Sequence, residues 1–277
     1  MKRTFTYRLP ETPLQYEATI QTTVRRQQSE QNYIQRAQLS VQTIKGKGWL
    51  AAPALLVEKN VAPWVYTLDN PADKLVAELQ EALSGLQLKM QPNGQPAEIL
   101  NHSQVWQQWQ VLRDKLAYTY QGDWPNGILQ HTDSTLLHKD RLLATFLKDL
   151  TWQEYFRNIY QVSWNGVEMP ATRMVYGIAG NTGIPLQESR RFTDHRDQQQ
   201  FSIKGYWKEL RPLDTLKRWK KHQQLSVEAA PLVVSYEGDY FLQPATGQCA
   251  GLTAAFRLQA GDDYEKTIRL NLVSLTR

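Results

Sequence analysis

The stretch from Asn70 to Gly122 constrains the fold most, because it predicts two helices and a hairpin that are each apolar on one face. Asn70 and Pro71 are typical of a helix N-terminus, since Asn accepts hydrogen bonds from free N–H groups and Pro has no N–H to leave unpaired. Gly85 is a natural C-cap for this first helix. Its apolar face has helical spacing and comprises Leu75, Val76, Leu79 and Leu83.

The hairpin and the second helix follow directly along the chain. Residues 86–90 alternate with the period of a strand, Pro92-Asn93-Gly94 is a turn signal, and residues 97–100 predict the return strand. Ser103 is predicted to cap the second helix, which ends at Gly122 and faces inward with Val105, Trp109, Leu112, Leu116 and Tyr120. Such a unit cannot bury its apolar faces alone, so it must pack against a sheet supplied by other parts of the chain.

Two long runs before this unit alternate between apolar and polar residues, over residues 14–24 and 33–43. Joined by a polar turn, they predict an antiparallel hairpin with one solvated face. Residues 49–57 predict a third strand that is more continuously apolar. The first part of the chain is therefore predicted to be a β-meander with the helix–hairpin–helix unit on its apolar face.

The rest of the chain predicts a third helix and more strands. After a turn at residues 122–126, Ser134 is predicted to cap a leucine-rich helix with an aromatic end at residues 152–160. Residues 167–211 show few clear periods, with short strands around Met174 and Phe201, and residues 214–222 predict a short basic helix. Residues 232–236 and 240–242 predict strands on either side of a turn at 237–239, and further alternating runs cover 250–258 and 268–272.

This order predicts an α+β fold with two antiparallel sheets, one N-terminal and one C-terminal, and a central set of three amphipathic helices packed on them. The predicted division is residues 1–160 and 161–277, with a single continuous domain as the alternative.

Composition excludes several classes of protein. The single cysteine, Cys249, excludes an internal disulfide framework and a cysteine-built zinc site. The N-terminus has no apolar segment like that of a signal peptide, and no run reaches the roughly 18–20 apolar residues of a membrane span. These features predict a cytoplasmic protein. A net charge of +5 among 277 residues is mild, and it favours an ordinary solvated surface over nucleic-acid binding.

One polar cluster has the residue types of a catalytic site. Asp194, His195 and Asp197 place a histidine between carboxylates, which is how a general base is oriented, and this leaves a hydrolase or nuclease as an alternative. Such a run is more often a solvated loop, which is the interpretation we prefer. His131 and His138 lack the spacing of a metal site, and the glycines at 177–183 lack the spacing of a dinucleotide fingerprint. We therefore expect no catalytic residue, metal or cofactor.

The chain has one basic stretch interleaved with aromatic residues, between 204 and 221. Basic and aromatic side chains together suit an acidic protein surface or, less favoured here, a nucleic acid. The alternative is a solvated basic helix whose Trp219 and Leu216 pack inward. The predicted partner-binding residues are Tyr206, Trp207, Lys217, Arg218, Trp219, Lys220 and Lys221.

Two stretches resemble a family of bacterial α+β proteins with no assigned activity: residues 86–94 leading through Asn101 to Trp106 or Trp109, and residues 240–247 leading into the last strands. The resemblance is structural and associates the chain with phage-tail-like contractile injection machines. With nine tryptophans and no clear catalytic constellation, the chain predicts a non-enzymatic adaptor, chaperone or structural accessory that binds another macromolecule. The alternative from a second class is a carrier whose curved sheet holds an apolar ligand against the helices.

Overall fold

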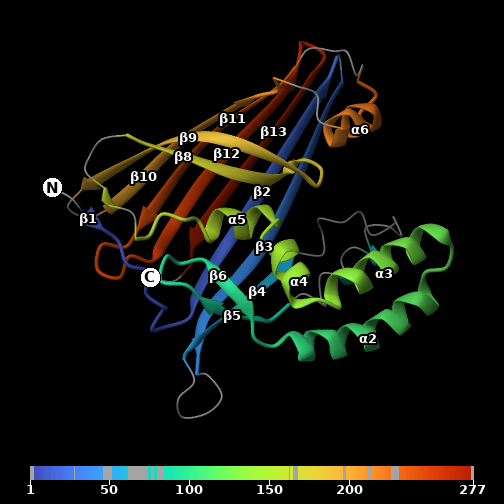
Figure 1. Cartoon of the computed structure of the whole chain (residues 1–277), viewed down its shortest axis with the longest axis horizontal. Helices are drawn as coiled ribbons and strands as arrows, with labels where there is room; N and C mark the ends of the chain where they lie inside the picture. Colours follow the sequence, from blue (N-terminus) through green and yellow to red (C-terminus); the bar gives the residue numbers. More distant parts are fainter. Residues whose placement is uncertain are drawn as a thin grey trace.

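One large antiparallel sheet dominates the computed structural model (Figure 1), which describes residues 3–27, 29–45, 52–61, 74–75, 78–79, 84–161, 163–164, 168–195, 198–210, 214–225 and 231–275. It has 11 strands in the order β6-β5-β4-β3-β2-β13-β12-β11-β10-β9-β8, and β1 and β7 form a separate two-stranded ribbon. The strands are β1 (Arg3–Thr4), β2 (Leu14–Arg26), β3 (Ser29–Ile44), β4 (Ala54–Val61), β5 (Leu86–Met90), β6 (Pro96–Ile99), β7 (Ser163–Trp164), β8 (Met169–Ala179), β9 (Thr182–His195), β10 (Gln198–Lys208), β11 (Leu232–Leu242), β12 (Cys249–Ala260) and β13 (Tyr264–Ser274).

The predicted pair of N-terminal and C-terminal sheets is wrong. Strand β2 pairs with β13 from Tyr16↔Ser274 to Arg26↔Tyr264, which joins the first and last strands of the chain into one sheet. Each predicted sheet would end in an edge strand whose N–H and C=O groups can pair with another strand. The sequence does not show whether β2 and β13 pair with each other, so it cannot distinguish two sheets from one. The division at residue 160 stays a prediction.

The helices also differ from the predicted set of three. Five are described: α2 (His102–Thr119), α3 (Asp123–Leu136), α4 (Lys139–Phe146), α5 (Leu150–Tyr155) and α6 (Asp214–His222). Helix α3 begins where a turn was predicted, and Ser134 lies inside it instead of capping the next helix. Asn70, the predicted start of the first helix, lies outside the described residues, while 74–75 and 78–79 are helical. In the part that is described, no helix has the length and hydropathy needed to cross a membrane.

The hairpin and second helix of the organising unit are confirmed. Strands β5 and β6 pair around the Asn93-Gly94 turn, and α2 buries Val105, Trp109 and Leu116 as its spacing predicts. The N-cap is Asn101, not Ser103. Its side chain accepts a hydrogen bond from the Gln87 N–H at 2.9 Å and donates one to the Gly85 carbonyl at 2.8 Å, which ties the start of α2 to the beginning of β5.

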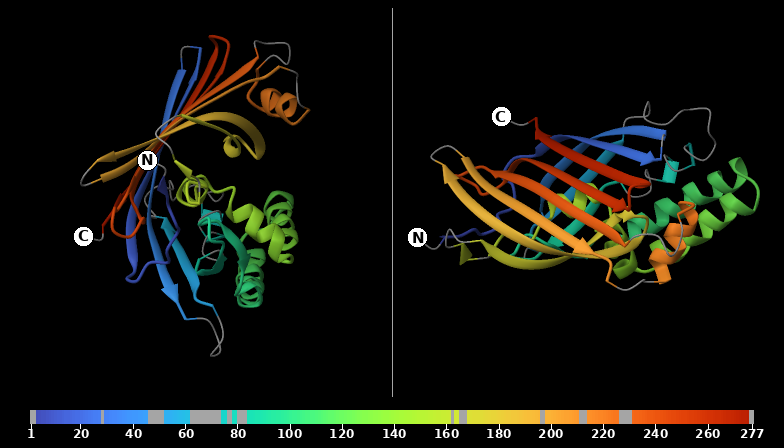
Figure 2. Two further views of the ribbon diagram at one scale, coloured as in Figure 1. Left: turned by 60° about the vertical axis from the view of Figure 1, so that its left-hand side comes forward. Right: turned by 90° about the horizontal axis from the view of Figure 1, so that it is seen from above.

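The sheet is strongly curved, and α2, α3, α4 and α5 lie on its concave side (Figure 2). Helix α5 contacts both β12 and β8, although these strands are four places apart in the sheet. At the usual spacing of neighbouring strands, a flat sheet would separate them by about 19 Å. A six-residue helix can touch both only because the sheet bends around it.

Candidate functional site

Helix α5 contacts several strands of the sheet from its concave side. Its N-cap is Asp149, whose carboxylate accepts hydrogen bonds from the backbone N–H groups of Thr151 at 3.0 Å and Trp152 at 3.2 Å. The same carboxylate pairs with Lys59 of β4 at 2.7 Å. Helices this short are not stable alone, so side-chain contacts with the sheet must hold α5 in place. We call residues 146–157, with the strand residues they contact, the α5 site.

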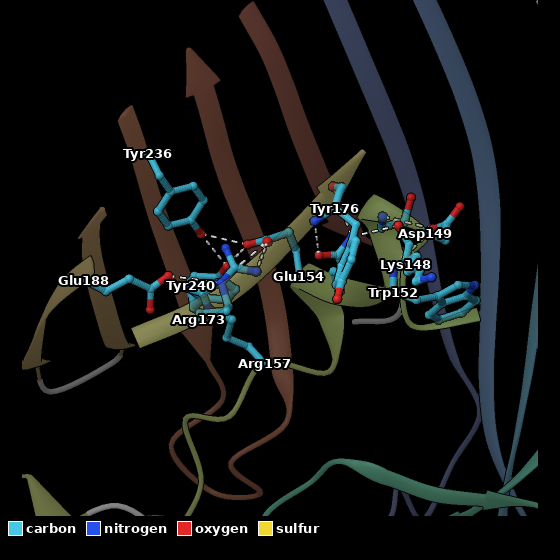
Figure 3. Close-up of polar contacts among 12 residues, drawn as sticks. Lys148, Asp149, Trp152, Glu154, Arg157, Arg173, Tyr176, Glu188, Tyr236 and Tyr240 are labelled. Carbon is cyan, nitrogen blue, oxygen red and sulfur yellow. Dashed lines mark hydrogen bonds and ion pairs between the residues drawn. The ribbon is translucent and has the colours of Figure 1, made fainter. Parts of the chain in front are cut away.

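Two further contacts fix α5 to β8 at the edge of the sheet. The side chain of Gln153 donates to the backbone carbonyl of Tyr176 at 3.3 Å and accepts from the N–H of Tyr176 at 3.1 Å. The Lys148 ammonium lies 5.2 Å from the centre of the Tyr176 ring (Figure 3). The Gln153 side chain thus pairs with both backbone groups of Tyr176, as a neighbouring strand would, although Gln153 belongs to a helix.

The side of α5 toward the sheet is aromatic. Trp152 stacks on Phe156 with ring centres 5.7 Å apart and lies 5.3 Å from Phe146. Tyr155 meets Tyr16 of β2 edge-to-face at 5.5 Å. Such pairs stabilise by about 0.5–1.5 kcal/mol each beyond the burial of their surface. The predicted aromatic end of a third helix is thus a compact cluster on the concave face.

A buried carboxylate lies beside this cluster. Glu154 has no exposed surface, and its Oε2 accepts hydrogen bonds from the hydroxyls of Tyr236, at 2.7 Å, and Tyr240. Burial raises the pKa of both tyrosines well above its ordinary value, and the charge of Glu154 raises it further against the lowering effect of Arg157. Both phenols therefore stay protonated and donate to Glu154.

Three arginines surround Glu154 and a second buried carboxylate, Glu188 of β9. Figure 3 shows two of them, Arg157 and Arg173, beside the carboxylates. Arg173 of β8 bridges the two, at 2.6 Å from Glu154 Oε1 and 3.0 Å from Glu188 Oε1. Arg157 Nη2 lies 2.7 Å from Glu188 Oε1, and Arg190 Nη2 lies 2.8 Å from Glu188 Oε2. Burial works to lower the pKa of Arg157, but Tyr236, Tyr240 and the two carboxylates more than offset this, so its pKa is raised.

Gly238 makes room for the two tyrosines. A Cβ at this position would lie 2.2 Å from the hydroxyl oxygen of Tyr236 and 3.2 Å from the Tyr240 ring. Tyr236, Gly238 and Tyr240 occupy alternate positions on one face of β11, so the rings fold over the glycine toward Glu154. The turn predicted at 237–239 is therefore wrong. β11 continues through it, and the glycine serves side-chain packing in a strand.

Cavities lie on two sides of Trp152. The Lys59 cavity has a volume of about 580 Å³, and its walls include Lys59, Arg141, Phe146, Lys148 and Trp152. The Arg173 cavity has a volume of about 340 Å³, and its walls include Trp152, Phe156, Arg157, Arg173 and Arg190. A third cavity of about 660 Å³ lies away from the α5 site, beside Ala54, Lys89 and Asn101. Trp152 is thus a wall common to two cavities.

Strands β8, β9 and β10 are long, where only short strands around Met174 and Phe201 were predicted. The physical reason is the α5 site itself. The inward positions of β9 include Leu186, Glu188 and Arg190, so the buried face carries charges and the apolar–polar alternation disappears. Two signals of this site were present in the sequence: the aromatic run at residues 152–160, and Glu188 and Arg190 at alternate positions of a stretch without clear periods.

The predicted catalytic cluster of Asp194, His195 and Asp197 stays a prediction. Asp194 lies near the end of β9 and is exposed, while Asp197 lies outside the described residues. His195 is the last residue of β9, at the end of the strand. No group of three or more possible metal ligands occurs among the residues that are described.

The predicted partner-binding residues lie in different environments. Tyr206, Arg218 and Lys221 are exposed, whereas Trp207, Lys217 and Trp219 are half-buried. Trp219 packs against Tyr264 at 5.5 Å, and Lys220 is buried and pairs with Glu209 at 2.8 Å. Helix α6 thus directs Trp219 and Lys220 toward the protein. Binding of a partner at this surface stays a prediction.

No family model and no curated protein matches the chain, so the resemblance to a bacterial family stays a prediction. A solved structure titled "Lipid-protein interactions in lipovitellin" is similar over 96% of this chain, with 11% sequence identity and a TM-score of 0.44. The chain spans 25% of that structure. A similarity of this degree supports no conclusion about function.

Proposed function

We propose that the protein is a carrier that holds an apolar ligand between the concave face of the sheet and α5. The observation that carries this proposal is the aromatic cluster of α5, which lies against the sheet with a cavity on either side of Trp152. Cavities for small ligands usually measure about 300–1,000 Å³ and combine aromatic walls with a few polar groups. The Lys59 and Arg173 cavities have this size and composition.

The way α5 is held is suited to ligand entry. Six helical residues bury large aromatic side chains, while the polar contacts that orient the helix come from few residues: Asp149, Gln153 and Glu154. A helix this short has little stability of its own, so α5 can leave the sheet as one unit when these contacts break. An apolar chain that enters beside Trp152 would replace ring contacts with its own and gain about 0.8 kcal/mol for each buried methylene group.

We favour this proposal over the macromolecule-binding hypothesis, which stays a prediction, because α6 packs Trp219 against Tyr264 and pairs Lys220 with Glu209. The two hypotheses differ in what accompanies the protein through purification. A carrier retains a small apolar molecule, and an adaptor retains a protein of defined stoichiometry.

Native mass spectrometry of the full chain, purified without detergent and then titrated with palmitic acid and hexadecanol, tests the carrier directly. We expect a one-to-one complex with at least one of the two. Replacement of Trp152 by Leu should weaken binding about tenfold, since it removes the wall that both cavities share. The matched control is Trp124→Leu on α3, where the side chain is 52% exposed, and it should bind as the wild type does. Absence of any complex, or equal binding by the two variants, would contradict the proposal.

A further inference from the structure

We infer that the Arg173 cavity is an anion site, which takes the carboxylate or phosphate head group of an amphiphilic ligand. The inference rests on the proposed carrier function and specifies the chemistry of its ligand. It starts from the charge balance of the α5 site, where three arginines, Arg157, Arg173 and Arg190, surround only two carboxylates, Glu154 and Glu188.

The excess of one positive charge is buried. The side chains of Glu154 and Glu188 are fully buried, and those of Arg157, Arg173 and Arg190 are 1%, 15% and 10% exposed. Buried charges are normally paired, because taking an ion out of water is costly. The Arg173 cavity is lined by all three arginines, and none of its described lining residues is acidic. A ligand that enters this cavity therefore meets positive charge without a competing carboxylate on the wall.

Hydrogen-bond donors are also available there. Arg157 Nε, Arg157 Nη1 and Arg173 Nη2 are buried and have no hydrogen-bond partner among the described residues. Nη1 of Arg157 does lie 3.7 Å from Glu154 Oε1, which is an ion-pair distance but not a hydrogen bond. Both guanidinium groups also lie against aromatic rings, since Arg157 is 5.1 Å from the centre of the Tyr236 ring and 5.5 Å from that of Tyr240, and Arg173 is 5.1 Å from that of Tyr236. A ring accepts an N–H group only weakly, so these donors can still take the oxygen of a ligand as a stronger acceptor.

The geometry of the donors indicates the class of acceptor. A guanidinium group presents its N–H bonds in a planar fork that matches two oxygens of a carboxylate or a phosphate. The existing partners hold these forks in place, since Glu188 binds Arg157 and Arg173, and Glu154 binds Arg173. Trp152, Phe156 and Leu147 form the apolar wall of the same cavity. An anionic head beside the arginines and an apolar chain along Trp152 would satisfy both walls at once.

The test compares three ligands with the same chain and different heads: palmitic acid, hexadecyl phosphate and hexadecanol. Isothermal titration calorimetry with the full chain measures each, and inorganic phosphate is titrated separately. We expect both or one of the anionic amphiphiles to bind at least about tenfold more tightly than the alcohol, as charge-assisted hydrogen bonds imply. The tighter of the two anions identifies the head group as carboxylate or phosphate.

The variant that tests the arginine fork is Arg157→Lys, which keeps the charge beside Glu188 and removes the fork. It should reduce the preference for anionic heads, measured as the ratio of the affinity for each anion to the affinity for hexadecanol. The control, Arg257→Lys on β12, lies outside both cavities with a side chain that is 52% exposed, and it should keep the preference. Circular dichroism and thermal unfolding verify that each variant folds. Because the wild-type comparison needs no variant, a folding failure of Arg157→Lys leaves the test intact.

The outcomes separate the two proposals. Equal affinity for all three amphiphiles would overturn the anion site and leave the carrier standing. Binding of inorganic phosphate, lost in Arg157→Lys, without binding of any amphiphile would support the anion site and overturn the carrier. No binding of any of the four would overturn both.

Discussion

The two ends of the sheet bury very different inner faces. At the β4–β6 end, the face toward the helices is apolar, with Leu55, Leu86 and Leu88 fully buried, and α4 packs against β6. At the β8–β11 end, the inner face carries Glu188, Arg190, Tyr236 and Tyr240, with α5 adding Glu154. Buried ion pairs often stabilise a fold no more than apolar residues of the same volume would. Under the proposed carrier function, the first end serves packing and the second holds the ligand.

Removing one carboxylate charge from each end should show the contrast most strongly. Glu154→Gln leaves Arg173 and Arg157 with one carboxylate to share, and we expect it to lower the free energy of unfolding by about 3–5 kcal/mol. The control at the other end is Glu98→Gln, which breaks a partly exposed pair with Lys139 at 2.9 Å and should cost about 0–1 kcal/mol. Urea unfolding measures both. Equal effects would contradict the proposed asymmetry.

A methyl group added at the charged end should also be costly. Gly238→Ala places a Cβ 2.2 Å from the Tyr236 hydroxyl, so the ring must move, and we expect a loss of about 1–3 kcal/mol. Gly127→Ala on α3 is the matched control, because its Cβ would meet nothing within 4 Å. Alanine there should stabilise the helix by about 0.5–1 kcal/mol. The same chemical change thus has opposite signs at the two sites, and a stable Gly238→Ala protein would count against the tyrosine geometry.

Alkaline pH should weaken the charged end together with the other buried tyrosines, Tyr16, Tyr155 and Tyr160, because burial raises the pKa of these side chains too. Burial raises the pKa of Tyr236 and Tyr240, so the folded state keeps protons that the unfolded state releases above a pKa of about 10. Their contribution to stability is complete below that pH and is lost as pH rises toward the folded pKa, by up to about 1.4 kcal/mol per pH unit for each tyrosine. Urea unfolding between pH 8 and roughly pH 11.5, beyond the tyrosine range, measures the slope. Tyr236→Phe should reduce it, whereas Tyr118→Phe, at an exposed position on α2, should not.

The smallest effect concerns the cap of α5. Asp149→Ala removes two hydrogen bonds at the helix N-terminus and the pair with Lys59, and we expect a loss of about 1 kcal/mol. If α5 opens to admit ligand, this variant should also raise the rate of ligand exchange, measured by stopped-flow displacement of a fluorescent fatty acid. Lys139→Ala removes a pair near the other end of the sheet and should leave that rate unchanged.

The same contrast explains what could be predicted from the sequence. Where the inner face is apolar, period and turn chemistry suffice: the long strands β2 and β3, the β5–β6 hairpin and the buried face of α2 all follow from their residues. Where the inner face is charged, periodicity and turn residues do not predict the strands correctly. The strands β8 to β10 were obscured by Glu188 and Arg190, and Gly238 suggested a turn because the sequence does not show two tyrosines folding over it. The pairing of β2 with β13 depends on long-range contacts that no local pattern encodes.

The most direct test of the carrier is hydrogen–deuterium exchange of the full chain with and without saturating palmitic acid or hexadecyl phosphate. A ligand that lies between α5 and the sheet should suppress the local opening of α5, so amides of residues 150–160 should exchange more slowly, with those of α2 unchanged. Protection confined to another part of the molecule, or no change in α5 under conditions where mass spectrometry shows a complex, would contradict the account.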